Sequence, residues 1–211
     1  MQLDRNGYYD VPAGKIAAVV TWLEMTEPPT PRPVPDLPRL SLRRVERPDP
    51  DWYRDLHRRV GADWLWFSRL VMSDAELLAT IRDPLVEVHA LARDGRDEGL
   101  LELDRREAPD VELAFFGLTS ALVGQGAGRW LMARALDLAW RHRPRRFWVH
   151  TCTLDHPAAL GFYRRSGFRA YRRAVEIADD PRLQGLVPRD SAAWLPVIGE
   201  EPQVVATGVS G

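Results

Sequence analysis

A glycine-rich run in the second half of the chain constrains its fold more than any other feature. The run is Val123-Gly124-Gln125-Gly126-Ala127-Gly128, between an apolar segment that ends at Leu118 and a helical pattern that begins at Arg129. Glycines adopt backbone conformations closed to other residues, so successive N–H groups can turn toward one anion, and the following helix adds the positive end of its dipole. The run therefore predicts a strand, a phosphate-binding loop and a helix, in this order.

The glycine spacing excludes two common phosphate-binding loops. No Lys-Ser or Lys-Thr pair follows the last glycine, as a P-loop requires, and G-x-G-x-G differs from the G-x-G-x-x-G of dinucleotide-binding folds. The kind of loop that binds the pyrophosphate of an acyl-coenzyme A remains.

Two motifs in order resemble the GNAT (Gcn5-related N-acetyltransferase) family. Motif A of that family reads Arg/Gln-x-x-Gly-x-Gly/Ala. Gly126 and Gly128 match it, whereas Val123 stands at the Arg/Gln position and supplies no polar side chain. The segment 159–168 resembles the family's A-x-x-x-Y-x-x-x-G-F segment, and His156 stands where the family usually has Asn.

This resemblance implies an α/β acyltransferase that uses acetyl-CoA as its cosubstrate. The GNAT fold is a mixed, mostly antiparallel sheet flanked by helices and splayed between two central strands, here 112–118 and 145–153. The implied reaction is direct transfer of acetyl to a primary amine of a small molecule or peptide. Transfer of a longer acyl group, transfer to an oxygen acceptor, and a non-catalytic acyl-CoA-binding or interaction module stay open.

The resemblance also assigns cofactor-binding roles. The backbone of Leu118 and Thr119 is expected to pair with the pantetheine amides, and the loop with the pyrophosphate. The full expected set is Leu118, Thr119, Val123, Gly124, Gln125, Gly126, Ala127, Gly128, Arg129 and His156. A β-bulge is expected within 117–120, where a backbone N–H can serve as an oxyanion donor.

Tyr163 is the candidate general acid. It stands one helical turn before Gly167, where the family presents a tyrosine hydroxyl toward the CoA sulfur. The alternative is that Tyr163 and Phe162 pack under the sheet without a chemical role.

Glu112 is the candidate general base. It lies at the strand position where histone-acetylating members of the family carry a base glutamate. Because Phe115 and Phe116 make the surroundings apolar, we expect desolvation to raise the pKa of the Glu112 carboxyl toward neutrality. An ordered water chain, His150 or His156 stays open as the base.

Composition excludes several other classes of site. His150, Cys152 and His156 match no standard zinc spacing, so no metal is expected, and a single cysteine excludes an internal disulfide. A net charge of −1 from 29 basic and 30 acidic residues gives no field that points to nucleic acid or membrane. No apolar signal core begins the chain, which favours a cytoplasmic location, and a homodimer stays open.

The rest of the sequence predicts how the chain is divided into an arm, a linker, a domain and an extension. Six prolines within 28–38 indicate an extended linker, and 16–25 reads as a strand. The expected parts are an N-terminal arm over 1–27, the linker 28–38, the acyltransferase domain 39–178 and a C-terminal extension 179–211. Further strands are expected at 41–46, 86–92, 99–104 and 168–177, and helices at 51–60, 73–82, from 129, and after a cap at Asp155 or His156.

Aromatic residues gather in the segment that shapes the acceptor pocket in this family. They are Trp52, Trp64, Trp66 and Phe67. Aromatic side chains beside a cleft suit an apolar or aromatic acceptor, and packing in the core is the alternative for at least two of them.

Overall fold

The computed structural model describes residues 6–199 of the 211-residue chain. Its strands are β1 (Lys15–Met25), β2 (Leu40–Arg44), β3 (Val86–Arg93), β4 (Arg96–Asp104), β5 (Asp110–Leu118), β6 (Arg146–Cys152) and β7 (Arg169–Asp179). Its helices are α1 (Pro50–Gly61), α2 (Asp74–Ile81), α3 (Ala127–Arg141) and α4 (Ala159–Arg165), with short 3₁₀ turns η1 (Ala62–Trp64) and η2 (Ser120–Leu122). Residues 1–5 of the predicted arm and 200–211 of the predicted extension lie outside the described residues.

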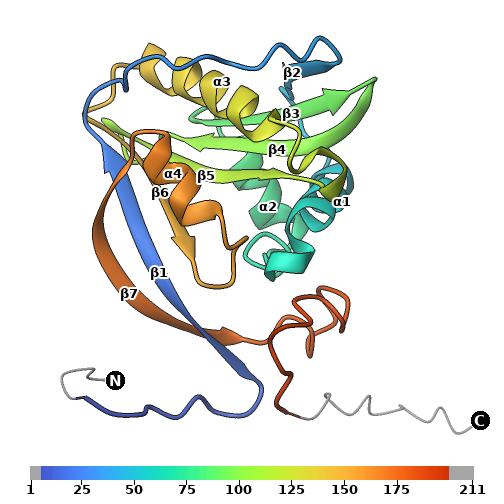
Figure 1. Ribbon diagram of the computed structural model, residues 1–211. Coiled ribbons are helices and arrows are strands. Elements are labelled where there is room, and N and C mark those ends of the chain that lie inside the picture. The colour runs from blue at the N-terminus through green and yellow to red at the C-terminus, as the bar shows by residue number, and fades with distance from the viewer. Residues whose placement is uncertain (1–5, 200–211) are drawn as a thin grey trace, which may run out of the picture.

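The strands form one seven-stranded sheet in the order β2-β3-β4-β5-β6-β1-β7 (Figure 1). Every neighbouring pair is antiparallel except β5 and β6, which run parallel. The expected mixed, mostly antiparallel sheet is confirmed. The start of α2 is where the sequence predicted it, because Ser73 and Glu76 form the expected capping box.

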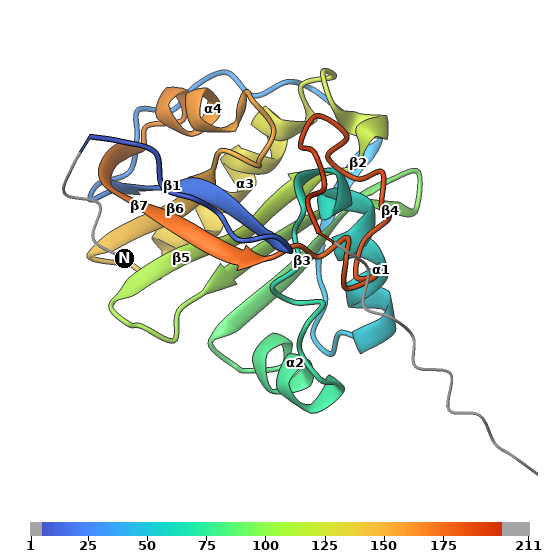
Figure 2. The ribbon, with the colours of Figure 1, turned by 90° about the horizontal axis from the view of Figure 1, so that it is seen from below.

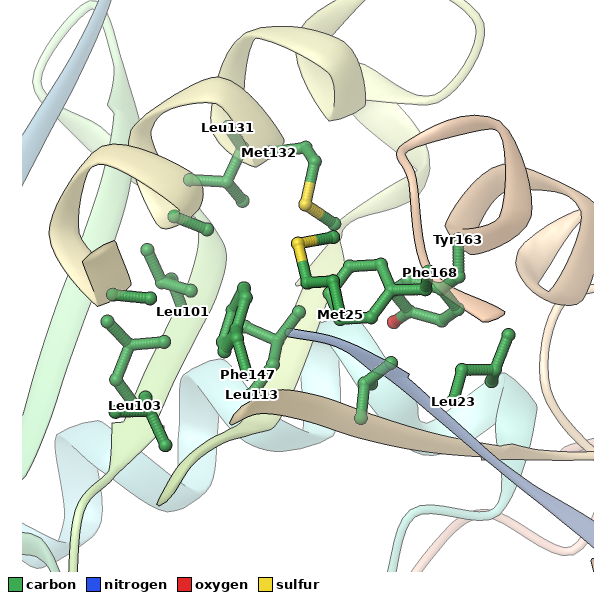
Figure 3. Packing of buried hydrophobic residues seen from close by; sticks show 14 of the residues in the cluster. Leu23, Met25, Leu101, Leu103, Leu113, Leu131, Met132, Phe147, Tyr163 and Phe168 are labelled. Atoms are coloured by element: carbon green, nitrogen blue, oxygen red, sulfur yellow. The ribbon is translucent and has the colours of Figure 1, made fainter. Parts of the chain in front are cut away.

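Helices cover both faces of the sheet, which we call the α3 face and the α1 face (Figure 1). On the α3 face, α3 and α4 pack on β1 and β3–β6 around fully buried residues such as Leu113, Leu131 and Phe147 (Figure 3). On the α1 face, α1 and α2 pack on β3 and β4 around Tyr53 and Leu77. None of the helices in residues 6–199 is long and apolar enough to cross a membrane.

The N-terminal strand is an interior strand of the main sheet. β1 pairs with β6 on one side and with β7 on the other, and Leu23 and Met25 enter the α3-face core at 0% and 3% exposure. At its other end, Ile16 and Ala18 pack against the C-terminal segment, which Figure 2 shows beside the ends of β1 and β7. Both ends of the described chain are thus built into one fold.

The buried position of β1 predicts a large stability difference between two of its residues. Leu23→Ala should lower the free energy of unfolding by about 2–5 kcal/mol, because it opens a cavity in the core. Val19→Ala, on the same strand but 41% exposed, should cost ~0.5 kcal/mol or less. Urea unfolding followed by circular dichroism measures both, and equal effects would show that β1 is not part of the core.

Candidate functional site

A gap between β5 and β6 forms the centre of the candidate site. The two strands pair only at Asp110–Arg146, Val111–Phe147 and Glu112–Trp148. Beyond these pairs β5 continues to Leu118 and β6 to Cys152 without sharing a ladder. The predicted splay is therefore present, and it widens toward the carboxyl ends of both strands.

The glycine loop lies at the wide end of this gap. Gly124 and Gly126 have φ angles of +80° and +83°, a left-handed conformation that favours glycine. Gly126 is the N-cap of α3 and offers no side-chain cap, and the first helical bond recorded runs from Trp130 N–H to the Gly126 carbonyl at 3.1 Å.

The first N–H groups of α3 have no acceptor within the described part of the chain. They belong to Ala127, Gly128 and Arg129. Unpaired donors at the positive end of a 15-residue helix are suited to binding an anion. The residues present therefore fit the phosphate groups that the sequence predicts here.

Two residues outside the motif support the loop. Arg93, at the end of β3, donates from Nη1 to the Gln125 side-chain oxygen at 3.2 Å and to the Ala121 carbonyl at 3.3 Å. Pro35 lies against the other side, where a Cβ at Gly126 would be 3.2 Å from its Cγ. Sequence reasoning missed both, because each reaches the loop only through tertiary contacts.

Leu118 and Phe162 lie beside the glycine loop at the gap. A Cβ at Gly128 would lie 3.7 Å from the Phe162 ring and 3.9 Å from Leu118 Cδ1. Thr119 N–H is already bound to the Glu98 carbonyl at 2.9 Å, on the β4 side. Since backbone groups alternate in direction along a strand, those of Leu118 point away from β4 and into the gap.

A β-bulge interrupts β5, but not where we expected it. Glu102 pairs with Phe115 and Leu103 with Leu113, so Ala114 is the extra residue, and the position predicted within 117–120 was wrong. The bulge reverses the side-chain alternation of the strand. As a result Phe115 packs on the α1 face and Phe116 on the α3 face.

Tyr163 lies on the α3 face of the gap. Its ring is 7% exposed and contacts Phe116 and Phe168 at centroid distances of 6.2 and 5.9 Å (Figure 3). Burial raises the pKa of the phenol far above its ordinary value, so the hydroxyl keeps its proton. Within residues 6–199 no hydrogen bond is recorded for this hydroxyl, which leaves it free to donate to a bound group.

Glu112 faces a histidine on the α1 face. Its Oε1 lies 3.4 Å from His150 Nδ1, and the side chain is 22% exposed. The interaction with Glu112 raises the pKa of the His150 imidazole above its ordinary value. Since the strands are parallel and Glu112 pairs with Trp148, His150 lies further toward the wide end of the gap.

Trp66 bridges the wide end of the gap on the α1 face. Its ring lies against β5, where a Cβ at Gly117 would be 2.8 Å from Trp66 Cη2. Its Nε1 donates to Asp155 at 3.0 Å, and Asp155 also accepts from Thr151 Oγ1 at 2.6 Å in the loop after β6. The segment after α1 is thereby joined to the loop after β6.

Of the other aromatic and histidine residues singled out in the sequence, some contact each other near the loop after β6 and others lie away from the gap. Trp64 contacts the ring of His156 at 5.0 Å. Trp52 instead donates to Asp97 at 3.0 Å, and Phe67 packs with the C-terminal segment, both away from the gap. His156 Nδ1 accepts the Ala158 N–H at 3.0 Å, yet α4 begins at Ala159 with no side-chain cap, so the expected cap at Asp155 or His156 was wrong.

No group of three or more His, Cys, Asp or Glu side chains within residues 6–199 is arranged to hold a metal ion. Cys152 is partly buried, and burial raises the pKa of its thiol to about 11. A thiol in that state is a weak nucleophile at neutral pH.

Comparison with known proteins places this arrangement in a family. The model of the acetyltransferase (GNAT) family matches residues 37–168, more than half of the chain. The chain belongs to the GNAT family. Members of the family transfer an acetyl group from acetyl-CoA. No curated protein is significantly similar in sequence to this GNAT chain.

Solved structures share the fold at low sequence identity. A GCN5-related N-acetyltransferase from Sphaerobacter thermophilus superimposes with a TM-score of 0.56 at 16% identity, over 80% of this chain and 53% of that one. An aminoglycoside acetyltransferase from an uncultured soil metagenomic sample, in complex with sisomicin, gives 0.53 at 17% identity, over 66% of this chain and 94% of that one.

A tandem GNAT protein from the clavulanic acid biosynthesis pathway gives a TM-score of 0.50 at 17% identity, over 82% of this chain and 55% of that one. The chain thus spans about half the length of the tandem and Sphaerobacter proteins. At these identities the likeness shows the fold alone.

Proposed function

We propose that this GNAT protein is an acetyl-CoA-dependent N-acetyltransferase that transfers acetyl directly to a primary amine of a small molecule or peptide. One observation carries the proposal. The unpaired N–H groups at the start of α3, the neighbouring Leu118 and Phe162, and the Glu112–His150 pair all lie beside the part of β5 and β6 that shares no ladder, and we take this series of groups as the path along which cofactor and acceptor bind. A binding module without turnover needs the first part of this path but not the second.

The cofactor side of the path uses mainly backbone groups. When bound, acetyl-CoA supplies an acetyl group activated as a thioester. The N–H groups of Ala127, Gly128 and Arg129 would hold the pyrophosphate, and the backbone of Leu118 the pantetheine arm. Because these contacts need no particular side chain, the valine at position 123 leaves them intact.

Tyr163 would supply the proton for the departing thiolate. Its phenol stays protonated at every physiological pH because burial raises its pKa. It has no competing partner among the described residues, and its ring is held by Phe116 and Phe168. A fixed, neutral donor of this kind suits general acid catalysis.

Glu112 and His150 would together take the proton from the amine. The carboxylate faces Nδ1, so a proton on Nδ1 leaves Nε2 as the lone-pair nitrogen, and the imidazole lies nearer the wide end of the gap. Glu112 accepts the amine proton directly, through one water, or by way of His150.

Charge on the acceptor side favours a cationic amine. Glu112 and Asp155 are carboxylates at the two ends of the open part of the gap, near the α1 face. A protonated amine is attracted to such a site before it loses its proton. A neutral hydroxyl acceptor gains nothing from these charges, which is the reason we favour N-acetylation over transfer to oxygen.

A screen for acetyl-CoA consumption tests the proposal. The panel contains polyamines, amino acids, aminoglycosides, arylamines and lysine peptides, with mass spectrometry of every product. We expect an amide product that is about 42 Da heavier than one of these amines, the mass of an acetyl group less that of the hydrogen it replaces. Binding of acetyl-CoA without turnover across the panel would favour the binding module, and an ester product would favour an oxygen acceptor.

Gly126→Val should weaken acetyl-CoA binding while the fold survives. Valine disfavours a φ of +83°, and its Cβ would press on Pro35, so the loop must rearrange. Gly95→Val is the matched control, since Gly95 also has a positive φ, +85°, but lies in the β3–β4 turn with open space around it. Calorimetry should show reduced affinity for Gly126→Val alone, and equal affinities would remove the loop assignment.

Tyr163→Phe should lower turnover by about 10²–10⁴-fold, the usual effect of losing a general acid. Affinity for acetyl-CoA should change little, because the ring that packs on Phe116 is kept. Single-turnover kinetics separates chemistry from binding. Full turnover in the variant would make Tyr163 a packing residue, with water protonating the thiolate.

Glu112→Gln should lower the rate and move the acidic limb of the pH–rate profile to lower pH. His150 is protonated below its raised pKa and cannot accept a proton there, so the rate falls as the pH drops through that value. The Glu112 carboxylate is what raises the pKa of His150, so its loss lowers that pKa. His150→Gln is the companion variant, and acidic limbs unchanged in both would assign the base to water or His156.

A further inference from the structure

β7 is a long edge strand with an exposed surface. It runs for 11 residues at the end of the sheet, where β1 is the only strand of the described residues that pairs with it. Its large apolar side chains are open to solvent, with Tyr171, Val175 and Ile177 exposed by 43%, 40% and 41%. The opposite edge strand, β2, has only five residues. Long unpaired edges are templates for a further strand.

The charges along β7 are self-complementary. Arg169, Arg172 and Arg173 occupy its first half, and Glu176 and Asp179 its second half. If a second β7 pairs antiparallel about a two-fold axis at Ala174, Arg172 lies opposite Glu176. This pair occurs twice, and no like charges face each other over 172–176.

A shift of the two-fold axis by one residue removes this pairing of opposite charges. With the axis at Arg173, that arginine faces its own copy. With the axis at Val175, Glu176 faces Ala174, and the Arg172–Glu176 pair does not form. The sequence of β7 therefore selects one alignment among those nearest to it.

Arg172 and Glu176 are both accessible to a second copy of the chain. Arg172 and Glu176 are both exposed and lie on one face of the strand, since they pair with Trp22 and Ala18 of β1. Glu176 has no ion-pair partner within residues 6–199, and Arg172 rests on the Trp22 ring at 4.5 Å. The bulge of β7 at Tyr171 confines regular pairing to 172–176, with the charge pairs at its two ends.

We propose that β7 is a homodimer interface, in which two copies of this chain join their sheets edge to edge about a two-fold axis at Ala174. The pairing satisfies the unpaired N–H and C=O groups of the edge over 172–176. The occupant is a second copy of the same chain because the charge pattern complements itself. This inference does not depend on the proposed acetyl transfer.

Charge-reversal variants test the interface by sedimentation equilibrium. The wild type should be a dimer of 24.0 kDa chains. Arg172→Glu and Glu176→Arg should each raise the dimer dissociation constant at least about tenfold, because attraction becomes repulsion at two places. The double variant R172E/E176R should restore the dimer. Arg47→Glu, an exposed arginine before α1, is the charge-matched control and should leave the dimer intact.

A cysteine pair tests the register. In a Cys152→Ser background, Ala174→Cys should form a disulfide-linked dimer with a mild oxidant, since directly opposed strand residues have Cα atoms about 4.5–5.5 Å apart, within disulfide reach. Ala170→Cys, which lies four residues from the two-fold axis, should not. A monomeric wild type, a dimer insensitive to the charge reversals, or equal cross-linking at both positions would each overturn the proposal.

Discussion

The site depends on the early end of the β5–β6 ladder. After Glu112 and Trp148 the two strands share no hydrogen bonds, so backbone groups on both sides of the gap are left for other partners. Contacts on both faces of the sheet secure the two strands beyond the end of their ladder. Phe116 stacks on Phe162 at 5.6 Å on the α3 face, and Trp66 reaches Asp155 on the α1 face. Together these contacts hold β5 and β6 in place on either side of the gap.

A buried polar network lies on the α1 face of the sheet, next to Phe115 of β5. Glu102 is fully buried and accepts from Tyr53 Oη and Arg69 Nη2, both at 2.5 Å, while the Arg69 guanidinium lies 5.0 Å above the Phe115 ring. Each carboxylate oxygen has a donor, which is the condition under which a buried charge is tolerated. Burial lowers the pKa of the neighbouring His57 to about 3, so that imidazole stays neutral against Phe115.

The N-terminal third of the chain completes the same site from outside the motifs. β1 holds β6 from the side opposite the gap, so β6 can diverge from β5 without losing its place in the sheet. The proline-rich segment then passes both motif glycines. A Cβ at Gly167 would lie 2.8 Å from Pro29, and one at Gly126 3.2 Å from Pro35. A segment read as a linker thus lies against the end of α4 and the start of α3.

The sequence by itself determined the features that depend on residues close together along the chain. The strands and helices, the capping box at Ser73, the left-handed glycines at 124 and 126 and the splayed sheet followed from periodicity, turn chemistry and motif resemblance. Tertiary structure alone decided the contact of His150 with Glu112 and the hydrogen bonds of Trp66 and Arg93. These partners are far apart in sequence, and strand register, a one-residue bulge and the divergence of two strands bring them together, none of which leaves a local signal.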